Sequence, residues 1–217
     1  MALKIYADLL NAIYQYTSSA AGDFNAFGGT IDTVVTMAEN RMFRELRCRE
    51  MEQTLTSTVT ISGGVVPLQA DYIDLKYAYI TSEQPYRYLT KRTAGWLRER
   101  FPYRAASSKP QFIAREGSSF IFGPYPDTGQ TYTIGGYYWG RPVTMVGVTT
   151  TASSNAVFLT HPDLYVAAAI CETRPYLKGI DAEGMAVWEQ KYNTIKRALL
   201  DEVRAEQFEG SEIVGDE

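Results

Sequence analysis

The chain has 217 residues, of which 45% are hydrophobic and 21% are charged, so it can form a real core in one domain or two small ones. Its net charge of −4 disfavours tight DNA binding as the main task, because phosphate contacts supply most non-specific affinity. The 16 tyrosines suit both half-buried strands and protein interfaces, and composition alone leaves these two interpretations open.

Export and membrane signals are missing from the sequence. Met1 to Lys4 are not followed by a long apolar run, so we expect no signal peptide. No stretch of about 18 apolar residues predicts a membrane span. Cys48 and Cys171 stand beside apolar residues in helical patterns, which favours buried free thiols over a disulfide.

Two helices are predicted at the start of the chain. Residues 3–18 have an amphipathic pattern, and the glycines from Gly22 to Gly29 mark a loop. Thr30 is placed to cap a second helix, from Ile31 to about Met51. The predicted apolar stripes consist of Leu3, Tyr6, Leu10 and Ile13, with Leu9 beside them, and of Ile31, Val34, Ala38, Met42 and Leu46.

Arg41, Arg44 and Arg47 recur every three residues along the second helix, so the pattern predicts one basic ridge. One interpretation is that these arginines pair with the interleaved glutamates on the surface. The other is that they make salt bridges between subunits or contact passing DNA. We favour pairing, within or between subunits.

The middle of the chain predicts strands. Residues 54–61 are rich in β-branched types, 62–64 form a turn signal, and 65–68 resume the strand. Thr90 could cap a short helix around 94–101, and 144–156 reads as a loop or exposed hairpin. The other predicted strands are 73–81, with Tyr77 and Tyr79 on one face, 110–115, 119–123 and 132–139.

Helical periodicity returns near residue 160. Thr160 and Asp163 have the spacing of a capping box, and Pro162 suits a first helical turn. Pro175 should end or kink this helix. The strongest helical pattern follows, from Ala182 to about Arg204, with a stripe made of Met185, Trp188, Tyr192, Ile195, Leu199 and Val203.

This order predicts an α+β fold, because neither helical pair can bury its stripe alone. We expect a helical bundle formed by the N- and C-terminal helices, with an inserted antiparallel β domain. The expected divisions are 1–52 plus 157–207 for the bundle, 53–156 for the β domain, and 208–217 for a flexible C-terminal arm.

Catalytic, cofactor and metal motifs are not found, so we expect no enzyme activity and no cofactor. His161, the single histidine, is expected to serve as a cap or surface residue. Carboxylate pairs can catalyse glycoside hydrolysis without a local motif. The two candidates, Glu50 with Glu52 and Asp201 with Glu202, are interpreted as solvated faces.

Several fragments in a fixed order carry a family resemblance. They are Ala38–Arg47 running into Glu50–Glu52, Val66–Leu75, Pro110–Ile113, Phe120–Asp127, Tyr137–Pro142, Leu159–Tyr165, Pro175–Leu177 and Trp188–Tyr192. Together they resemble the head–tail adaptor (head completion or connector) proteins of tailed bacteriophages, of the tail tubular protein A type found in short-tailed phages.

The resemblance implies a virion protein at the head–tail interface, made in the cytoplasm of the host bacterium. It implies a ring of about twelve copies docked under the portal protein, with a tail or nozzle protein on the opposite side. Double-stranded DNA would pass through the bore without sequence specificity. Two alternatives stay open: an adaptor with peptidoglycan hydrolase activity, and a DNA-binding module.

The last ten residues have acidic side chains, two glycines and no helical period, so we expect a disordered arm in the free protein. Phe208, Ile213 and Val214 are apolar residues that a solubilising tail would not need. They could bind a partner groove or a sheet edge. In related adaptors the C-terminal arm reaches the portal, so the resemblance implies a portal-binding arm; a floppy acidic end without a partner is the alternative.

Overall fold

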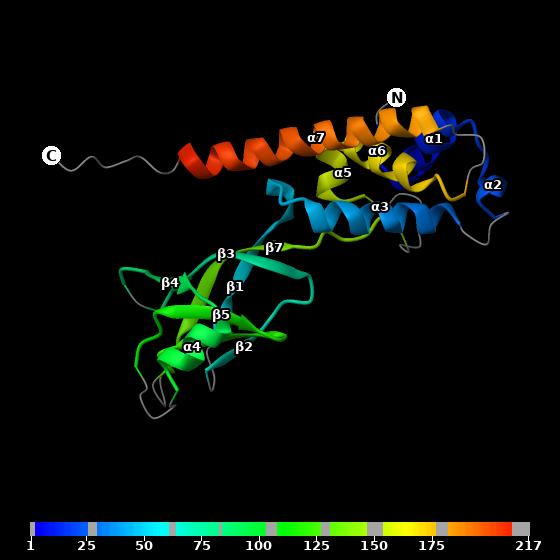
Figure 1. The fold of residues 1–217 in the computed structure, drawn as a ribbon. Coiled ribbons are helices and arrows are strands. Elements are labelled where there is room, and N and C mark those ends of the chain that lie inside the picture. Colours follow the sequence, from blue (N-terminus) through cyan, green and yellow to red (C-terminus); the bar gives the residue numbers. More distant parts are fainter. Residues whose placement is uncertain are drawn as a thin grey trace. The chain divides into compact units, whose positions relative to one another are not determined.

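The computed structural model describes residues 3–25, 30–60, 64–82, 84–102, 108–126, 131–146, 154–176 and 182–209. The chain divides into two compact units (Figure 1). The first, here called the helical unit, consists of residues 1–51 and 142–217. The second, the β unit, consists of residues 52–141. The fold is α+β, as predicted, with N- and C-terminal helices packed together and a mostly antiparallel sheet inserted between them in the sequence.

The helical unit is built around one buried helix. Helix α6 (Pro162–Glu172) is buried from Leu164 to Ile170, as expected for a helix that is apolar on all sides. Helices α1, α3 and α7 all pack against it. The bounds of the other elements are α1 (Tyr6–Thr17), α2 (Ala21–Asn25), α3 (Ile31–Glu45), a 3-10 turn at Arg49–Met51, α5 (Ala156–Thr160) and α7 (Ala182–Glu209).

Several helix signals in the sequence are confirmed. The side chain of Thr30 accepts a hydrogen bond from the Thr33 amide at the start of α3, and Pro162 occupies the first turn of α6. The stripe of α7 is buried at Met185, Tyr192 and Leu199. Both cysteines are free, with Cys48 buried and Cys171 half-buried.

Helix α3 is shorter than predicted. It ends at Glu45, and Leu46 has an extended backbone with φ −102° and ψ 149°. Leu46 and Cys48 are both buried, whereas Arg47 between them is only half-buried. Burial with a period of two suits an extended chain and not a helix, which is why the predicted continuation to Met51 is wrong.

Other helix boundaries also differ from the prediction. Residues 21–25 form the short helix α2 where a loop was expected, and α5 precedes α6. The predicted capping box of Thr160 does not form: Asn155 caps α5, and Thr160 donates to the Ala156 carbonyl. His161 has no side-chain cap hydrogen bond at the start of α6.

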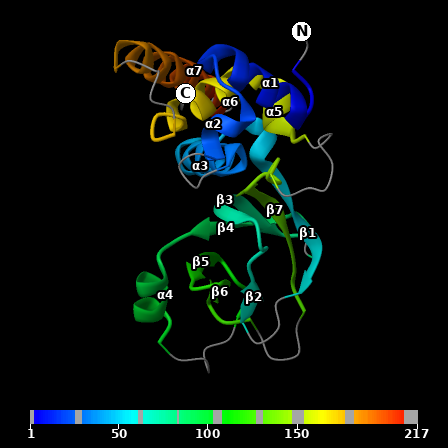
Figure 2. The same ribbon diagram turned by 90° about the vertical axis from the view of Figure 1, so that its right-hand side faces the viewer.

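The β unit contains one seven-stranded sheet in the order β1-β7-β3-β4-β5-β6-β2. Its pairs are antiparallel except for β4 with β5. Helix α4 packs against β5, and Figure 2 shows it at the side of the sheet. The bounds are β1 (Glu52–Thr60), β2 (Val65–Pro67), β3 (Tyr72–Ile80), β4 (Arg87–Lys91), α4 (Ala94–Arg100), β5 (Phe112–Glu116), β6 (Ser119–Gly123) and β7 (Thr133–Gly140).

The sheet curls around a single core. Leu55 of β1 and Val66 of β2 belong to the same buried cluster, although these strands are last in the sheet order at opposite ends. Strands β3 and β7 approach closely at Gly136, whose φ is +152°. A Cβ atom there would lie 2.3 Å from the Tyr77 carbonyl oxygen, so only glycine fits.

Pairing in the β unit departs from the order of the sequence. The segment after the 62–64 turn signal does not continue β1; it forms β2, which pairs with β6, while β1 pairs with β7. Strand β4 was not predicted. Helix α4 is capped by Thr93 and not by Thr90, which lies in β4. Of the predicted turn at 62–64, residues 62 and 63 lie outside the described residues, and Gly64 has a φ of +79°.

Candidate interaction surfaces

Arg41 is the centre of an ion-pair network inside the helical unit. Its guanidinium binds both carboxylate oxygens of Glu189 on α7, with a distance of 3.1 Å between Nη1 and Oε2. Its Nη1 also lies 3.5 Å from Glu172 on α6. The guanidinium carbon is 4.4 Å from the centre of the Tyr192 ring. Arg41 therefore links α3 to α6 and α7, and its hydrogen bond with Glu189 raises its pKa and lowers that of the glutamate.

Glu45 extends this network by one turn of α3. It lies 3.6 Å from Arg41 and accepts hydrogen bonds from Lys196 at 2.8 Å and from the Tyr192 hydroxyl at 3.1 Å. Partial burial acts to raise the pKa of Glu45, but the hydrogen bonds from Lys196 and Tyr192 outweigh burial and lower it. The network thus favours the charged form of Glu45 and of Glu189.

The three arginines of the predicted ridge have different surroundings. Arg44 is exposed and donates to the Asn40 carbonyl at 3.0 Å. Arg47 lies beyond the end of α3 and donates to the Phe43 carbonyl at 3.1 Å, where it satisfies a helix-terminal acceptor. Because Arg47 is not helical, the three do not form one ridge. Their roles toward another subunit or a DNA bore stay a prediction.

A second polar network is buried under α3 and was missed by the sequence analysis. Glu39 is 1% exposed and accepts hydrogen bonds from the Met145 amide at 2.8 Å, the Thr144 hydroxyl, and the Tyr165 hydroxyl at 3.5 Å. Asn155 donates to Tyr165 at 2.7 Å. The segment between β7 and α5 is thus bonded to the helical unit near both of its ends, at Thr144 and Met145 and at Asn155.

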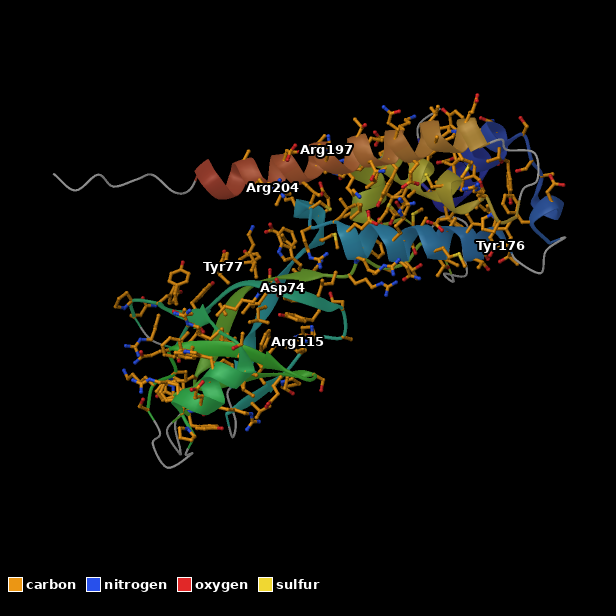
Figure 3. All side chains as sticks on the ribbon, viewed as in Figure 1. Asp74, Tyr77, Arg115, Tyr176, Arg197 and Arg204 are labelled. Atoms are coloured by element: carbon orange, nitrogen blue, oxygen red, sulfur yellow. The ribbon has the colours of Figure 1, made fainter. Side chains whose placement is uncertain are left out.

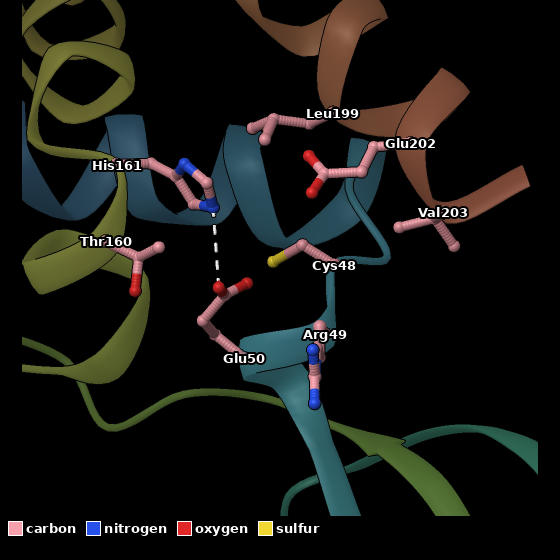
Figure 4. Close-up of a pocket in the computed structure, with 8 residues that line it drawn as sticks. All are labelled: Cys48, Arg49, Glu50, Thr160, His161, Leu199, Glu202 and Val203. Atoms are coloured by element: carbon pink, nitrogen blue, oxygen red, sulfur yellow. Dashed lines mark ion pairs between the residues drawn. The ribbon is translucent and has the colours of Figure 1, made fainter. Parts of the chain in front are cut away.

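The pocket in Figure 4 is the site that most resembles a catalytic centre. It encloses about 140 Å³ and is lined in part by Cys48, Glu50 and His161. Nε2 of His161 is 3.5 Å from a Glu50 carboxylate oxygen. Burial and the neighbouring Glu50 raise the pKa of Cys48 to about 12, so the thiol is protonated at neutral pH and is a poor nucleophile.

The described residues contain no group of three His, Cys, Asp or Glu side chains able to hold a metal ion. Of the carboxylates considered above, Glu52 pairs with Lys76 and Asp201 lies 3.5 Å from Arg204. The other two, Glu50 and Glu202, both line the pocket in Figure 4. Within the same part of the chain, no helix combines the length and apolar character needed to cross a membrane.

One surface of the β unit is covered by aromatic rings. Tyr77 and Tyr79 of β3 lie on one face, as predicted, with ring centres 6.3 Å apart. Neighbouring rings come from β7, from β4 and from the residue before β4. We call this surface the tyrosine face; its members are Tyr77, Tyr79, Tyr86, Tyr88 and Tyr137. Four of the five are exposed, and Figure 3 shows Tyr77 on the sheet near Asp74.

Two ion pairs involve lysines of these strands. The amino group of Lys76 is 2.5 Å from Glu52, and that of Lys91 is 2.7 Å from Asp74. Lys76 also lies over the Trp139 ring, at 5.3 Å from its centre. The strands around the tyrosine face therefore combine aromatic area with ion pairs that neutralise each other. The alternation of tyrosines in β3 indicated this surface, but the contribution of β4 could not be predicted.

The predicted C-terminal arm is described only at its first residues. Helix α7 continues to Glu209, so Phe208 belongs to the helix and not to an irregular segment. Ile213 and Val214 lie outside the described residues. Their proposed contact with the portal stays a prediction.

Comparison with known proteins adds one match. The family model described as SU10 adaptor protein matches residues 5–213, which is nearly the whole chain. A search of curated proteins finds no match.

Proposed function

The chain belongs to the SU10 adaptor protein family, and on that premise we propose that it is a head–tail adaptor that forms a ring between the portal and the tail of a phage virion. The observation that carries the proposal is the family match over residues 5–213. The family match and the sequence resemblance both identify a phage adaptor protein. The narrower assignment to the tail tubular protein A type is part of the proposal.

The proposed role is structural. A ring subunit needs two different surfaces, one for each neighbour, and it needs no catalytic site. The exposed tyrosine face and the exposed residues of the bundle provide surfaces of different chemistry, which supports such an arrangement. The protonated Cys48 thiol gives no support to a hydrolase role. Purified protein should therefore leave no cleared zone on a peptidoglycan gel.

The portal is the proposed partner of the C-terminal arm. Phe208, Ile213 and Val214 would supply the apolar contacts, and the tail or nozzle protein would bind the opposite side of the ring. Helix α7 ends at Glu209, and the rest of the arm follows it in the sequence. This assignment rests on the apolar residues of the arm and on the resemblance to adaptors.

Duplex DNA would pass through the ring without specific binding. The net charge of −4 supports a bore to which DNA does not adhere, because tight binding requires a surplus of basic residues. Binding of free duplex should be weak and should disappear as salt is added. Nanomolar, sequence-specific binding at physiological salt would contradict this part of the proposal.

Sedimentation velocity with purified portal rings tests the adaptor role. The protein alone at micromolar concentration should sediment as a small species, because such rings often assemble only on their template. Mixed with portal, it should move with the portal boundary and increase its sedimentation coefficient. Unchanged portal and adaptor boundaries in the mixture would refute the proposal.

A further inference from the structure

The tyrosine face is preformed. Its neighbouring rings have centres between 5.2 and 6.3 Å apart, and the pairs Tyr77–Tyr79 and Tyr79–Tyr86 are stacked. Gly135 of β7 makes room for the central ring: a Cβ there would lie 3.1 Å from Tyr79 and 2.9 Å from Thr81. Rings that are already ordered lose little conformational freedom when a partner binds, so this surface is suited to recognition.

The area of the face also suits a macromolecular partner. A tyrosine offers about 150–250 Å² when it is fully covered, and Tyr88 and Tyr86 are 68% and 53% exposed. Together the five rings expose roughly a few hundred Å², which is the size of patch that marks interaction sites on soluble proteins. A patch of this size would form the centre of an interface and not the whole of it.

The pairing of the two lysines on these strands favours protein over nucleic acid. A phosphate backbone needs free Lys or Arg side chains, but Lys76 and Lys91 are each held by a carboxylate of the same sheet. Rings with exposed hydroxyl groups beside neutralised ion pairs match the composition of protein interfaces, in which tyrosine is enriched and unpaired charge is depleted.

The two units of the chain have opposite charge. The β unit contains ten Lys and Arg against seven Asp and Glu, whereas the helical unit contains eleven against eighteen. Two copies of the chain are therefore attracted when the β unit of one meets the helical unit of the other, and they are repelled when like units meet. This complementarity favours a head-to-tail contact, which can close into a ring.

We propose that the tyrosine face binds the helical unit of a second copy of this chain. The inference deepens the proposed ring and rests on it: it names the surface that one subunit presents to the next. Tyr77, Tyr86 and Tyr88 form the central contact, and the charge difference between the units orients the approach.

Photocrosslinking of the full chain tests the proposal. The reactive residue p-benzoylphenylalanine replaces Tyr88 in one preparation and Val65, an exposed residue of β2 outside the tyrosine face, in a control. Protein alone is irradiated at about 1 mM, because a single contact of a ring can be as weak as this. A second, isotope-labelled copy identifies links between chains by mass spectrometry.

The expected result from the Tyr88 position is crosslinked dimers and larger species that increase with protein concentration. The links should join the β unit to residues 1–51 or 142–217 of the labelled copy, and the Val65 probe should give far fewer. Links within one chain only, links to the β unit of the second copy, or no dimers would each overturn the proposal.

A double variant gives an independent measurement. Tyr86→Ser with Tyr88→Ser changes two exposed side chains and should leave the fold intact, as circular dichroism would verify. Equilibrium sedimentation should show that the self-association constant of the double variant is at least tenfold lower than that of the native protein. Addition of 1 M salt should also weaken the self-association of the native protein, because salt screens the attraction between the two units. Undiminished association of the double variant would overturn the proposal. Portal co-sedimentation is a separate readout, so failure of this contact is distinguishable from failure of the adaptor role.

Discussion

The helical unit and the β unit use their polar side chains in different ways. In the helical unit, Arg41 and Glu39 face inward and link helices that are far apart in the sequence. In the β unit, the aromatic rings of β3, β4 and β7 face outward, and the charges beside them pair locally on the sheet. The arginine spacing of α3 suggests a binding surface, yet Arg41 serves the interior of the helical unit. The ordinary alternation of β3 instead carries the accessible rings.

The largest stability effect should come from the centre of the helical network. Arg41→Met removes the cation shared by Glu189, Glu172 and Glu45 and leaves their partly buried carboxylates without it. We expect a loss of about 3 kcal/mol in the free energy of unfolding. Urea denaturation followed by circular dichroism measures it.

Arg44→Met is the matched control, because Arg44 is on the same helix but exposed. It should change stability by less than about 0.5 kcal/mol. Equal losses in the two variants would contradict the distinction between Arg41, which links three helices, and the exposed Arg44.

A smaller effect should follow from removing one hydroxyl from the buried network. Tyr165→Phe deletes the group that donates to Glu39 and accepts from Asn155. Both partners keep other hydrogen bonds, so we expect a loss of about 1–2 kcal/mol. Tyr88→Phe on the tyrosine face should be close to neutral in the same denaturation experiment, and a comparable loss there would show that the face is structural.

Acid should weaken the helical unit through the same carboxylates. The pKa values of Glu45 and Glu189 are lowered in the folded protein from their ordinary value of 4.5. Their contribution to stability is therefore full above pH 4.5 and is lost as pH falls through the lower folded values. Denaturation midpoints between pH 7 and pH 3 should fall less steeply for Arg41→Met than for the native chain. Parallel curves would exclude Arg41 as the cause.

The smallest stability effect is expected from truncation after Gln207. The cut removes two residues of α7 and the segment beyond it, while the last stripe residue, Val203, is retained. The melting temperature should stay within a few degrees, because no side chain of the buried stripe is lost. Portal binding should nevertheless be lost, and unchanged portal affinity would assign docking to the bundle instead of the arm.

Periodicity was sufficient to predict most elements and the fold class. The α7 stripe and the alternation at Tyr77 and Tyr79 were read correctly because one helix or strand contains the whole signal. The partners of the strands were not predictable in this way. Val65 to Pro67 pair with β6, more than 50 residues later in the chain, and nothing in the local pattern encodes that contact.

The same limit applied to the candidate surfaces. Glu39 stands between Ala38 and Asn40 of α3, and nothing in the local sequence distinguishes it from the exposed Glu45. Its burial depends on Met145 and Tyr165, which are more than 100 residues away in the chain. Arg41 and Arg44 are equivalent in spacing, but only Arg41 faces α7. A side chain's role in this chain depends on which distant element covers it, and helical spacing alone does not supply that information.

Electron microscopy of the protein mixed with its portal can show directly whether the adaptor forms a ring. We expect a closed ring of adaptor copies on one end of the portal, coaxial with it and open along the axis for DNA. We also expect averaged images of the Gln207 truncation mixed with portal to lack this ring. Portal particles without added density, or adaptor copies bound singly around the rim without contacts between neighbours, would contradict a ring-forming adaptor.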